Sequence, residues 1–204
     1  MPRCFLREKR HRLKPVLPIK ARKPAVFLDR DGTMAEEVGY LNHAERFRMF
    51  AFTGPAIRRL SDSGFAVFVV TNQSGVARGY FPESVVREVH ERMQRELVSQ
   101  GARLDGVYYC PHGSADHCDC RKPATGMIER AAREHAIDVR RSFVVGDRFR
   151  DMELAYRAGC KAIFVRTGYG LGEETWHAKE WPRQPDAIVD DLERAVDWIL
   201  GQTR

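Results

Sequence analysis

The sequence predicts an α/β protein: a three-layer αβα sandwich in which helices cover both faces of a central parallel sheet. Two patterns indicate this class. Short runs rich in β-branched and aromatic residues alternate with longer stretches whose apolar residues have helical spacing. The short runs are apolar at consecutive positions, as in strands buried on both faces. With 204 residues, the chain is long enough for one domain with a sizeable core.

The expected elements follow one another in strand and helix order. Strands are expected at 25–28, 65–70, 106–109, 142–146 and 161–165. Helices are expected at 54–63, 82–100, 126–135, 150–158 and 190–200. Gly64, Gly101 and Gly159 follow three of these helices, and glycine commonly ends a helix. Right-handed crossovers between successive strands then give a parallel sheet.

The positive charge of the chain is concentrated at its N-terminus. The formal net charge is +6, but residues 1–23 alone carry +8, which leaves −2 for the rest of the chain. We expect residues 1–23 to be a flexible leader, because charge-dense terminal segments seldom order themselves. Residues 24–204 are expected to form the folded domain, and the basic pI is therefore no sign of a nucleic-acid surface on that domain.

The apolar pattern argues against a membrane or secreted protein. No stretch approaches the ~20 apolar residues of a membrane span, and no apolar segment follows the basic leader as in a secretory signal. We therefore expect a cytoplasmic monomer that does not associate with membranes. In a reducing compartment, clustered cysteines favour a metal site over disulfides.

Polar residues follow the expected strands at the edge of the sheet where ligands bind in such folds. Asp29 and Asp31 follow the first strand, Thr71 the second, and Asp147 the fourth. Carboxylates that converge in one crevice repel each other unless a cation lies among them, and hard oxygen ligands suit Mg²⁺. The sequence therefore indicates a magnesium site, and magnesium in turn suggests a phosphorylated ligand.

A second metal site is indicated by four residues with zinc-ligand spacing: Cys110, His112, Cys118 and Cys120. Three thiolates and one imidazole form a closed tetrahedral set, which leaves no position for a substrate. We therefore expect a structural Zn²⁺ that pins the 110–123 loop and thereby positions Arg121 and Lys122. His117 is the alternative imidazole, but it adjoins Cys118 and leaves little chain to wrap the ion.

These motifs resemble those of the haloacid-dehalogenase (HAD) superfamily of phosphotransferases. The resemblance covers residues 24–200 and rests on Asp29-Arg-Asp31-Gly-Thr33, Thr71, Lys122 and Gly146-Asp147-Arg148-Phe-Arg-Asp151. It implies that Asp29 is a nucleophile that forms an aspartyl-phosphate and that Asp31 acts as general acid and base. It also implies that Mg²⁺ is held by the Asp29 carboxylate, the Asp31 backbone carbonyl and Asp147, and that Thr71 and Lys122 hold the phosphoryl oxygens. Asp151 is expected to brace the site or to cap its helix.

Within the superfamily, the zinc loop resembles a group that contains heptose bisphosphate phosphatases and histidinol-phosphate phosphatases. Matches at 27–33, 39–40, 70–79, 105–112 and 166–168 favour the former. That resemblance implies removal of the 7-phosphate of D-glycero-D-manno-heptose 1,7-bisphosphate, which leaves the 1-phosphate for nucleotide-activated heptose and lipopolysaccharide synthesis. The short spacing between His112 and Cys118 looks instead like the histidinol-phosphate group, which stays open as an alternative.

The expected phosphate and substrate contacts come from the strand ends, the zinc loop and a flap at 34–52, with no large cap domain. They are Thr71, Asn72, Gln73, Ser74, Arg121, Lys122, Arg148, Glu37, Gly39 and Tyr40. Arg78, Arg121 and Arg148 lie where a remote phosphate could be bound, although Arg78 and Arg148 could equally be solvated surface charges. A bisphosphate needs such cations, whereas cationic histidinol favours acids or aromatics.

Two other classes of function remain. Phosphatases of nucleic-acid 3′ ends share the Asp-x-Asp-Gly-Thr and Thr-Asn-Gln elements, and a basic leader could follow a phosphate backbone. The zinc loop and the mildly acidic folded part disfavour a nucleic-acid partner. A zinc-stabilised binding module without catalysis is disfavoured by the presence of both Asp29 and Asp31.

Overall fold

A six-stranded parallel sheet forms the centre of the protein in the computed structural model, which describes residues 22–202. The strand order is β3-β2-β1-β4-β5-β6. The strands are β1 (Ala25–Leu28), β2 (Ala66–Asn72), β3 (Gly106–Cys110), β4 (Phe143–Gly146), β5 (Lys161–Val165) and β6 (Ala187–Val189). Their parallel pairing confirms the predicted α/β class.

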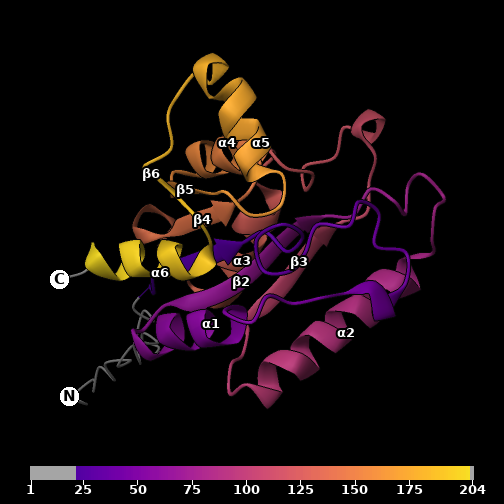
Figure 1. Cartoon of the computed structure of the whole chain (residues 1–204), viewed down its shortest axis with the longest axis horizontal. Helices are drawn as coiled ribbons and strands as arrows, with labels where there is room; N and C mark the ends of the chain where they lie inside the picture. The colour runs from indigo at the N-terminus through magenta and orange to yellow at the C-terminus, as the bar shows by residue number, and fades with distance from the viewer. Residues whose placement is uncertain (1–21, 203–204) are drawn as a thin grey trace, which may run out of the picture.

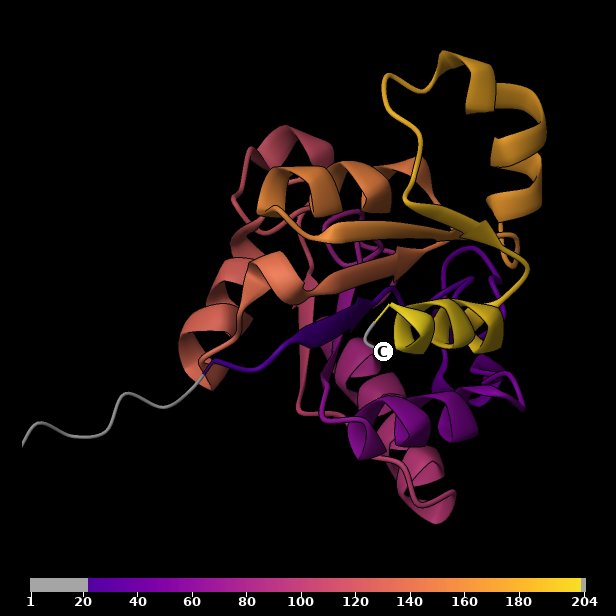
Figure 2. The same cartoon turned by 90° about the vertical axis from the view of Figure 1, so that its left-hand side faces the viewer.

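Helices cover both faces of this sheet (Figures 1 and 2). The α-helices are α1 (Thr53–Asp62), α2 (Glu83–Ser99), α3 (Gly126–His135), α4 (Phe149–Ala158), α5 (Gly170–His177) and α6 (Leu192–Gly201). Short 3₁₀ helices lie at η1 (Ala44–Arg46), η2 (Ser114–Asp116), η3 (Val139–Arg141) and η4 (Ala178–Glu180). The core residues of α1, α2 and α6 pack on one face, and those of α3 and α4 on the other.

The strands divide their side chains between these two layers. Leu28 packs in the same apolar cluster as Ile57 of α1, whereas its neighbour Phe27 packs in the cluster that contains Met152 of α4. All four side chains are fully buried. Each such side chain stabilises the fold by about 1.5–3 kcal/mol, because its apolar surface is removed from water. Burial on both faces explains why the strand sequences are continuously apolar.

All predicted elements form within two residues of their expected bounds, but β6 and α5 were not predicted. β6 is a three-residue edge strand with half-buried side chains, so it has no long apolar run. α5 begins in a stretch with Gly170 and Gly172, and glycine disfavours a helix interior. β2 continues two residues beyond its expected end, so that Thr71 and Asn72 belong to the strand.

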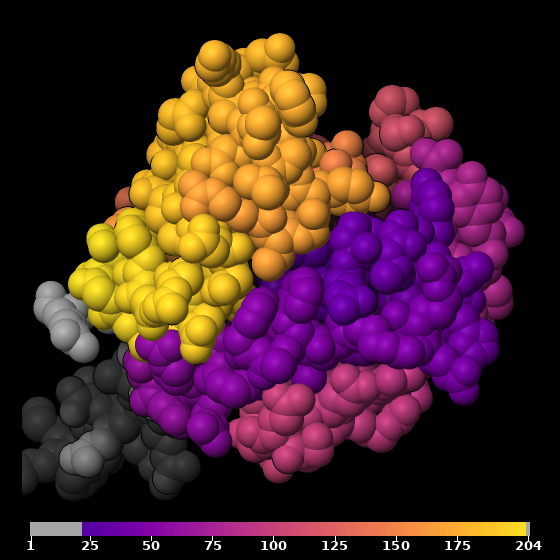
Figure 3. All heavy atoms as spheres, in the orientation of Figure 1, coloured from indigo at the N-terminus to yellow at the C-terminus, as the bar shows by residue number. Residues whose placement is uncertain are grey.

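The flap at 34–52 crosses the molecular surface beside α2 (Figure 3). Ala35 pairs with both Asp31 and Met49, and the hydroxyl of Thr53 donates to Met34 O at 2.7 Å. Arg92 of α2 donates to Ala44 O at 3.0 Å. These bonds tie the flap to the domain.

Only the end of the expected leader, Arg22 and Lys23, falls within the described residues. Lys23 N donates to Ala136 O at 3.1 Å, so Lys23 is part of the folded domain. The prediction for 1–21 concerns residues outside the described part. In the part that is described, no helix has the length and apolar character needed to cross a membrane.

Candidate active site

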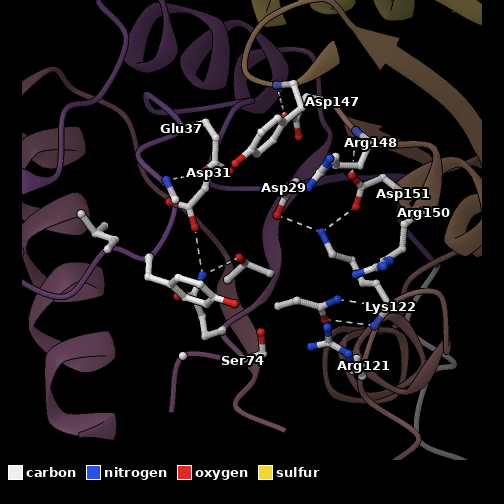
Figure 4. A pocket seen from close by; sticks show the side chains of 18 of the residues that line it. Asp29, Asp31, Glu37, Ser74, Arg121, Lys122, Asp147, Arg148, Arg150 and Asp151 are labelled. Atoms are coloured by element: carbon white, nitrogen blue, oxygen red, sulfur yellow. Dashed lines mark hydrogen bonds and ion pairs between the residues drawn. The ribbon is translucent and has the colours of Figure 1, made fainter. Parts of the chain in front are cut away.

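A cavity of about 390 Å³ lies beyond the carboxyl ends of β1, β2 and β4 (Figure 4). It brings together the residues that the sequence assigned to catalysis and substrate contact: Asp29, Asp31, Glu37, Gly39, Tyr40, Thr71, Asn72, Gln73, Ser74, Arg121, Lys122, Asp147 and Arg148. The parallel strands bring these distant segments to one edge of the sheet.

Asp29 lies at the end of β1 and is buried. Its backbone N–H donates to Val145 O of β4 at 2.9 Å, which fixes the backbone at the strand end. Lys122 Nζ lies 2.8 Å from Asp29 Oδ1. Burial raises the pKa of Asp29 to about 6, with Lys122 opposing the rise and Asp151 and Asp31 adding to it. A cation beside this carboxyl group would favour its ionised, nucleophilic form.

Asp147 is completely buried at the end of β4. Its Oδ2 accepts a hydrogen bond from Tyr169 N at 2.9 Å, but its Oδ1 is buried with no hydrogen-bond partner. Burial, together with Asp29 and Asp151, raises the pKa of Asp147 to about 9. A buried carboxylate oxygen without a donor is costly, and a bound cation would compensate it.

Two glycines leave room around Asp147. A Cβ at Gly32 would lie 2.2 Å from Asp147 Oδ2, and a Cβ at Gly168 would lie 2.3 Å from the same oxygen. Both glycines have positive φ values, +87° and +58°. These positions therefore exclude larger residues both by close approach and by backbone conformation.

Lys122 bridges two of the buried carboxylates. Its Nζ lies 2.8 Å from Asp29 Oδ1 and 2.5 Å from Asp151 Oδ1. Burial alone would lower the pKa of Lys122, but Asp151 and Asp29 outweigh it and raise the pKa above its usual value. Asp151 Oδ2 also accepts from Arg148 N at 3.3 Å at the start of α4. Asp151 thus has both geometries expected of it, the brace and the helix cap.

The carboxylates of Asp29, Asp147 and Asp151 form the candidate magnesium site. One oxygen from each lies within 4.8 Å of the others. This all-oxygen donor set, with the unpartnered Oδ1 of Asp147, fits Mg²⁺. The side chain of Asp31 is not part of this cluster.

The carboxylate of Asp31 accepts hydrogen bonds from the side chains of Arg30 and Gln73. Arg30 donates to both of its oxygens, through Nε to Oδ1 at 2.9 Å and through Nη2 to Oδ2 at 2.6 Å. Gln73 Nε2 donates to Asp31 Oδ2 and to Thr71 Oγ1, each at 2.9 Å. Gln73 therefore links the expected general acid to a predicted phosphoryl contact.

The flap contributes one side of the cavity. Glu37 Oε1 accepts from Gly39 N at 2.5 Å, and burial raises the pKa of Glu37. The ring of Tyr40 meets that of Tyr80 edge to face, with the centroids 4.6 Å apart. This pair joins the flap to the segment between β2 and α2 at the cavity wall.

Four arginines line the cavity in addition to Lys122. Arg121 donates to His112 O at 3.0 Å, and Arg148 pairs with Glu173 at 3.0 Å. Among the described residues, Arg78 and Arg150 have no ion-pair partner. These two arginines of the cavity wall are therefore not engaged by a carboxylate of the described part of the protein.

The expected zinc ligands form a second cluster beside the cavity. Cys110 Sγ lies 3.6 Å from both His112 Nδ1 and Cys118 Sγ. Cys120 Sγ lies 3.2 Å from His112 Nδ1 and 3.5 Å from Cys118 Sγ. A tetrahedral ion with Zn–S bonds of ~2.3 Å requires sulfur atoms about 3.8 Å apart, so the four donors fit Zn²⁺. His117 is outside the cluster.

Sequence reasoning missed several residues around these sites. Arg30 is almost completely buried beside Asp31, although its place between two aspartates could have drawn attention to it. His90 contacts Arg30 from α2, and nothing in its local sequence distinguishes it from a core residue of that helix. Tyr169 contributes its backbone N–H, and a backbone donor of this kind cannot be recognised from the residue type.

The chain is similar to several known phosphatases. A family model described as HAD-hydrolase-like matches residues 119–195. The chain is 44% identical to a D-glycero-D-manno-heptose-1,7-bisphosphate 7-phosphatase from Thermosynechococcus vestitus over 191 residues, which cover 87% of this chain and 95% of the relative. It is 42% identical to D-glycero-beta-D-manno-heptose-1,7-bisphosphate 7-phosphatase from Escherichia coli K12, with coverage of 78% and 87%.

A solved structure is also similar to this chain. It is D,D-heptose 1,7-bisphosphate phosphatase from B. bronchiseptica complexed with magnesium and phosphate. The TM-score is 0.80 at 32% identity, and the superposition covers 88% of this chain and 99% of the other.

Proposed function

The chain belongs to the D-glycero-D-manno-heptose-1,7-bisphosphate 7-phosphatase family of HAD-like hydrolases, and from this premise we propose how its residues hydrolyse the 7-phosphate of that sugar bisphosphate. The reaction is the hydrolysis of a phosphoric monoester. The observation that carries the proposal is the buried cluster of Asp29, Lys122, Asp147 and Asp151 at the strand ends, which opens into an arginine-lined cavity.

Magnesium is the proposed catalytic cofactor. The related enzyme from B. bronchiseptica was crystallised with magnesium and phosphate. In this chain, Asp29, Asp147 and the backbone carbonyl of Asp31 would hold the ion, and Asp151 lies close enough to join them directly or through water. When bound, Mg²⁺ neutralises charge on the phosphoryl oxygens and on the crowded carboxylates.

Asp29 is proposed as the nucleophile. Its carboxylate attacks phosphorus, the bond from phosphorus to the C7 oxygen breaks, and Asp31 gives its proton to that oxygen. Lys122 and the hydroxyl of Thr71 would hold phosphoryl oxygens while their charge redistributes. The products of this step are the heptose 1-phosphate and an aspartyl-phosphate on Asp29.

Asp31 is proposed to act again in the second step. It is now a carboxylate and takes a proton from water as the water oxygen attacks phosphorus. The bond between phosphorus and the Asp29 oxygen breaks, and inorganic phosphate leaves. Both aspartates then have their starting protonation states.

Zinc is proposed as a structural ion held by Cys110, His112, Cys118 and Cys120. Four protein ligands close the coordination shell, so the ion would take no part in the chemistry. Its proposed role is to fix the loop from which Lys122 reaches Asp29.

The remote 1-phosphate is proposed to contact arginines of the cavity wall. Arg78, Arg121 and Arg148 were expected there from the sequence, and all three line the cavity. Arg78 and Arg150 have no ion-pair partner among the described residues, which supports binding of a second anion. Histidinol phosphate offers a cation in place of this anion, and the arginines therefore favour the sugar bisphosphate.

A kinetic comparison tests the proposal. We expect the highest kcat/KM for the heptose 1,7-bisphosphate among four substrates: its two anomers, fructose 1,6-bisphosphate and histidinol phosphate. Asp29→Asn should abolish magnesium-dependent turnover, because an amide is no nucleophile. Equal and magnesium-independent rates for Asp29→Asn and the unchanged protein would contradict the mechanism.

The nucleic-acid alternative has a separate test. We expect no removal of phosphate from DNA 3′ ends, and deletion of residues 1–21 should leave turnover of the sugar bisphosphate unchanged. Activity on DNA ends without activity on sugar bisphosphates would contradict the proposed substrate. The expectation of a monomer can be checked by light scattering in the same preparations.

A further inference from the structure

Arg30 is a buried cation beside the proposed general acid. It is 1% exposed and lies between Asp29 and Asp31 in the sequence. Its guanidinium group engages Asp31 with two hydrogen bonds, and among the described residues Asp31 is its sole ion-pair partner. A two-pronged guanidinium–carboxylate pair fixes the plane of the carboxylate as well as its position.

His90 holds Arg30 from the other side. Its Nε2 lies 3.1 Å from Arg30 Nη1. Because arginine only donates hydrogen bonds, Nε2 must present a lone pair, and the ring is neutral with its proton on Nδ1. Burial lowers the pKa of His90 to about 3, and Arg30 adds to this effect, which is consistent with a neutral ring. The ring also packs against that of Tyr109, with the centroids 5.3 Å apart.

The contacts thus run from α2 to the catalytic carboxylate. His90 lies on a helix whose neighbouring residues Val89 and Met93 pack into the core, so its position is fixed by the fold. Arg30 transmits that position to Asp31. Gln73 supplies the third N–H donor to the Asp31 carboxylate, from the end of β2.

Neither Arg30 nor His90 lines the cavity, so neither is placed to contact the substrate. The side chain of Asp31, in contrast, is 17% exposed and lines the cavity. The side chains of the two buried residues therefore reach the cavity through the carboxylate of Asp31.

We propose that Arg30 and His90 are positioning residues that aim the carboxyl group of Asp31 at the leaving-group oxygen. The inference rests on the proposed function, since it takes Asp31 as the proton donor. General acid catalysis contributes roughly 10²- to 10⁴-fold to a rate and depends on close placement of the acid. Loss of the alignment should cost a large part of that factor.

The test uses leaving groups that differ in their need for a proton. An alkoxide such as the C7 oxygen of the heptose needs one, whereas p-nitrophenolate leaves without it. The measured quantity is kcat/KM for each substrate, which covers the steps up to alcohol release and omits hydrolysis of the aspartyl-phosphate. If the heptose bisphosphate is not a substrate, fructose 1,6-bisphosphate serves as the alkyl monoester. A wrong assignment of the substrate is then distinguished from a wrong assignment of the positioning residues.

Three variants distinguish alignment from packing. Arg30→Lys keeps the buried charge but loses the two-pronged contact. His90→Leu removes the acceptor for Arg30, and His90→Gln replaces it with an amide oxygen. For Arg30→Lys and His90→Leu we expect kcat/KM to fall roughly 10- to 100-fold on the alkyl monoester and less than about 3-fold on p-nitrophenyl phosphate. His90→Gln should stay within about 3-fold of the unchanged protein on both substrates.

Equal losses on the two substrates would overturn the proposal, because they would indicate general damage to the site. The proposal would also be overturned if Arg30→Lys or His90→Leu lowered kcat/KM further in an Asp31→Asn background, because that background already lacks the proton donor. If His90→Leu does not fold, Arg30→Lys alone decides, by whether its loss is selective for the alkyl substrate.

Discussion

The side-chain amide of Asn72 is hydrogen-bonded to both backbone polar groups of Lys122. Its Oδ1 accepts from Lys122 N at 3.0 Å, and its Nδ2 donates to Lys122 O at 3.3 Å. Asn72 ends β2, whereas Lys122 follows the zinc cluster, so this contact joins two segments far apart in the sequence. The sequence placed Asn72 among the substrate contacts, but its amide is oriented toward the backbone that carries Lys122.

Asn72→Ala should therefore displace Lys122 from its position in the site. We expect kcat for the sugar bisphosphate to fall roughly 10- to 100-fold, because displacement of a phosphate-binding group by about 1 Å can cost that much. The free energy of unfolding should fall by about 1–3 kcal/mol through the loss of two partly buried hydrogen bonds. Steady-state kinetics and urea unfolding measure the two effects.

Gln184 offers a matched control for this change. Its side-chain amide also donates to a backbone carbonyl, Ala178 O at 3.0 Å, but it is exposed and does not line the cavity. Gln184→Ala should leave kcat unchanged. A normal kcat in Asn72→Ala would show that Lys122 keeps its place without the amide.

Removal of a zinc ligand tests the structural metal. Cys118→Ser and Cys120→Ser should lose bound zinc in elemental analysis of the purified protein, since serine is a poor substitute for a thiolate. The melting temperature should fall, because zinc binding contributes to folding. The kcat should fall as well, because the loop next to Lys122 loses its anchor. Zinc content, melting temperature and kcat are measured on the same samples.

His117 is the control within the same loop. It adjoins Cys118 but lies outside the ligand cluster, and its φ of +46° is one that asparagine adopts readily. His117→Asn should keep its zinc and its activity. Loss of zinc in this variant, with retention in Cys118→Ser, would reassign the ligand set.

The main elements of the fold were predictable because apolar runs and the helical spacing of apolar residues are local features of the sequence. Continuous apolar runs marked the strands that are covered on both faces, such as Ala25–Leu28, and helical spacing marked the layers above and below them. β6 lacked the signal because an edge strand with half-buried residues needs no apolar run. The glycines of α5 weakened its helical signal in the sequence, and in the structure the helix packs on β5 and η4.

The cavity was predictable to the extent that its residues follow strands. Asp29 and Asp147 adjoin β1 and β4, and a parallel sheet brings such positions together whatever the details of packing. The contacts of Arg30 with His90 could not be foreseen, because they depend on how α2 packs beside β1. The bond between Asn72 and Lys122 depends likewise on the path of the zinc loop.

Gly168→Ala tests the space around Asp147. A Cβ at this position would lie 2.3 Å from Asp147 Oδ2, so the carboxylate would have to move. We expect weaker binding of Mg²⁺, seen as at least a 10-fold rise in the magnesium concentration that gives half-maximal activity, a shift equivalent to about 1.4 kcal/mol of binding free energy. Titration of activity with MgCl₂ measures the shift.

Gly159→Ala separates this effect from backbone strain. Gly159 also has a positive φ, +80°, but a Cβ there would meet nothing within 4 Å. The left-handed backbone conformation costs alanine about 1 kcal/mol of stability in both variants. Gly168→Ala should lose more than Gly159→Ala, because its Cβ would also lie 2.5 Å from Gly32 Cα. Only Gly168→Ala should need more magnesium, and an equal requirement in both variants would contradict the close-approach argument.

His90 should make the protein sensitive to acid. Burial and Arg30 lower its pKa from 6.5 to about 3, so in the folded state it stays neutral well below pH 6.5. The unfolded chain binds a proton at His90 below pH 6.5, and the folded protein does not until about pH 3. The stability that this residue contributes is therefore present above pH 6.5 and is lost progressively as the pH falls toward 3.

His90→Gln removes the ring that takes up a proton in the unfolded chain, and its amide oxygen keeps an acceptor for Arg30. Urea unfolding at several pH values between 7 and about 4.5 should show that the unchanged protein loses up to about 1.4 kcal/mol more stability per pH unit than the variant, the value for uptake of one proton. Acid also weakens zinc binding, but both proteins share the zinc cluster, so this effect cancels in the difference. Parallel pH dependences would mean that His90 accepts a proton in the folded state near its ordinary pKa, and that its Nε2 does not serve Arg30 as a fixed acceptor.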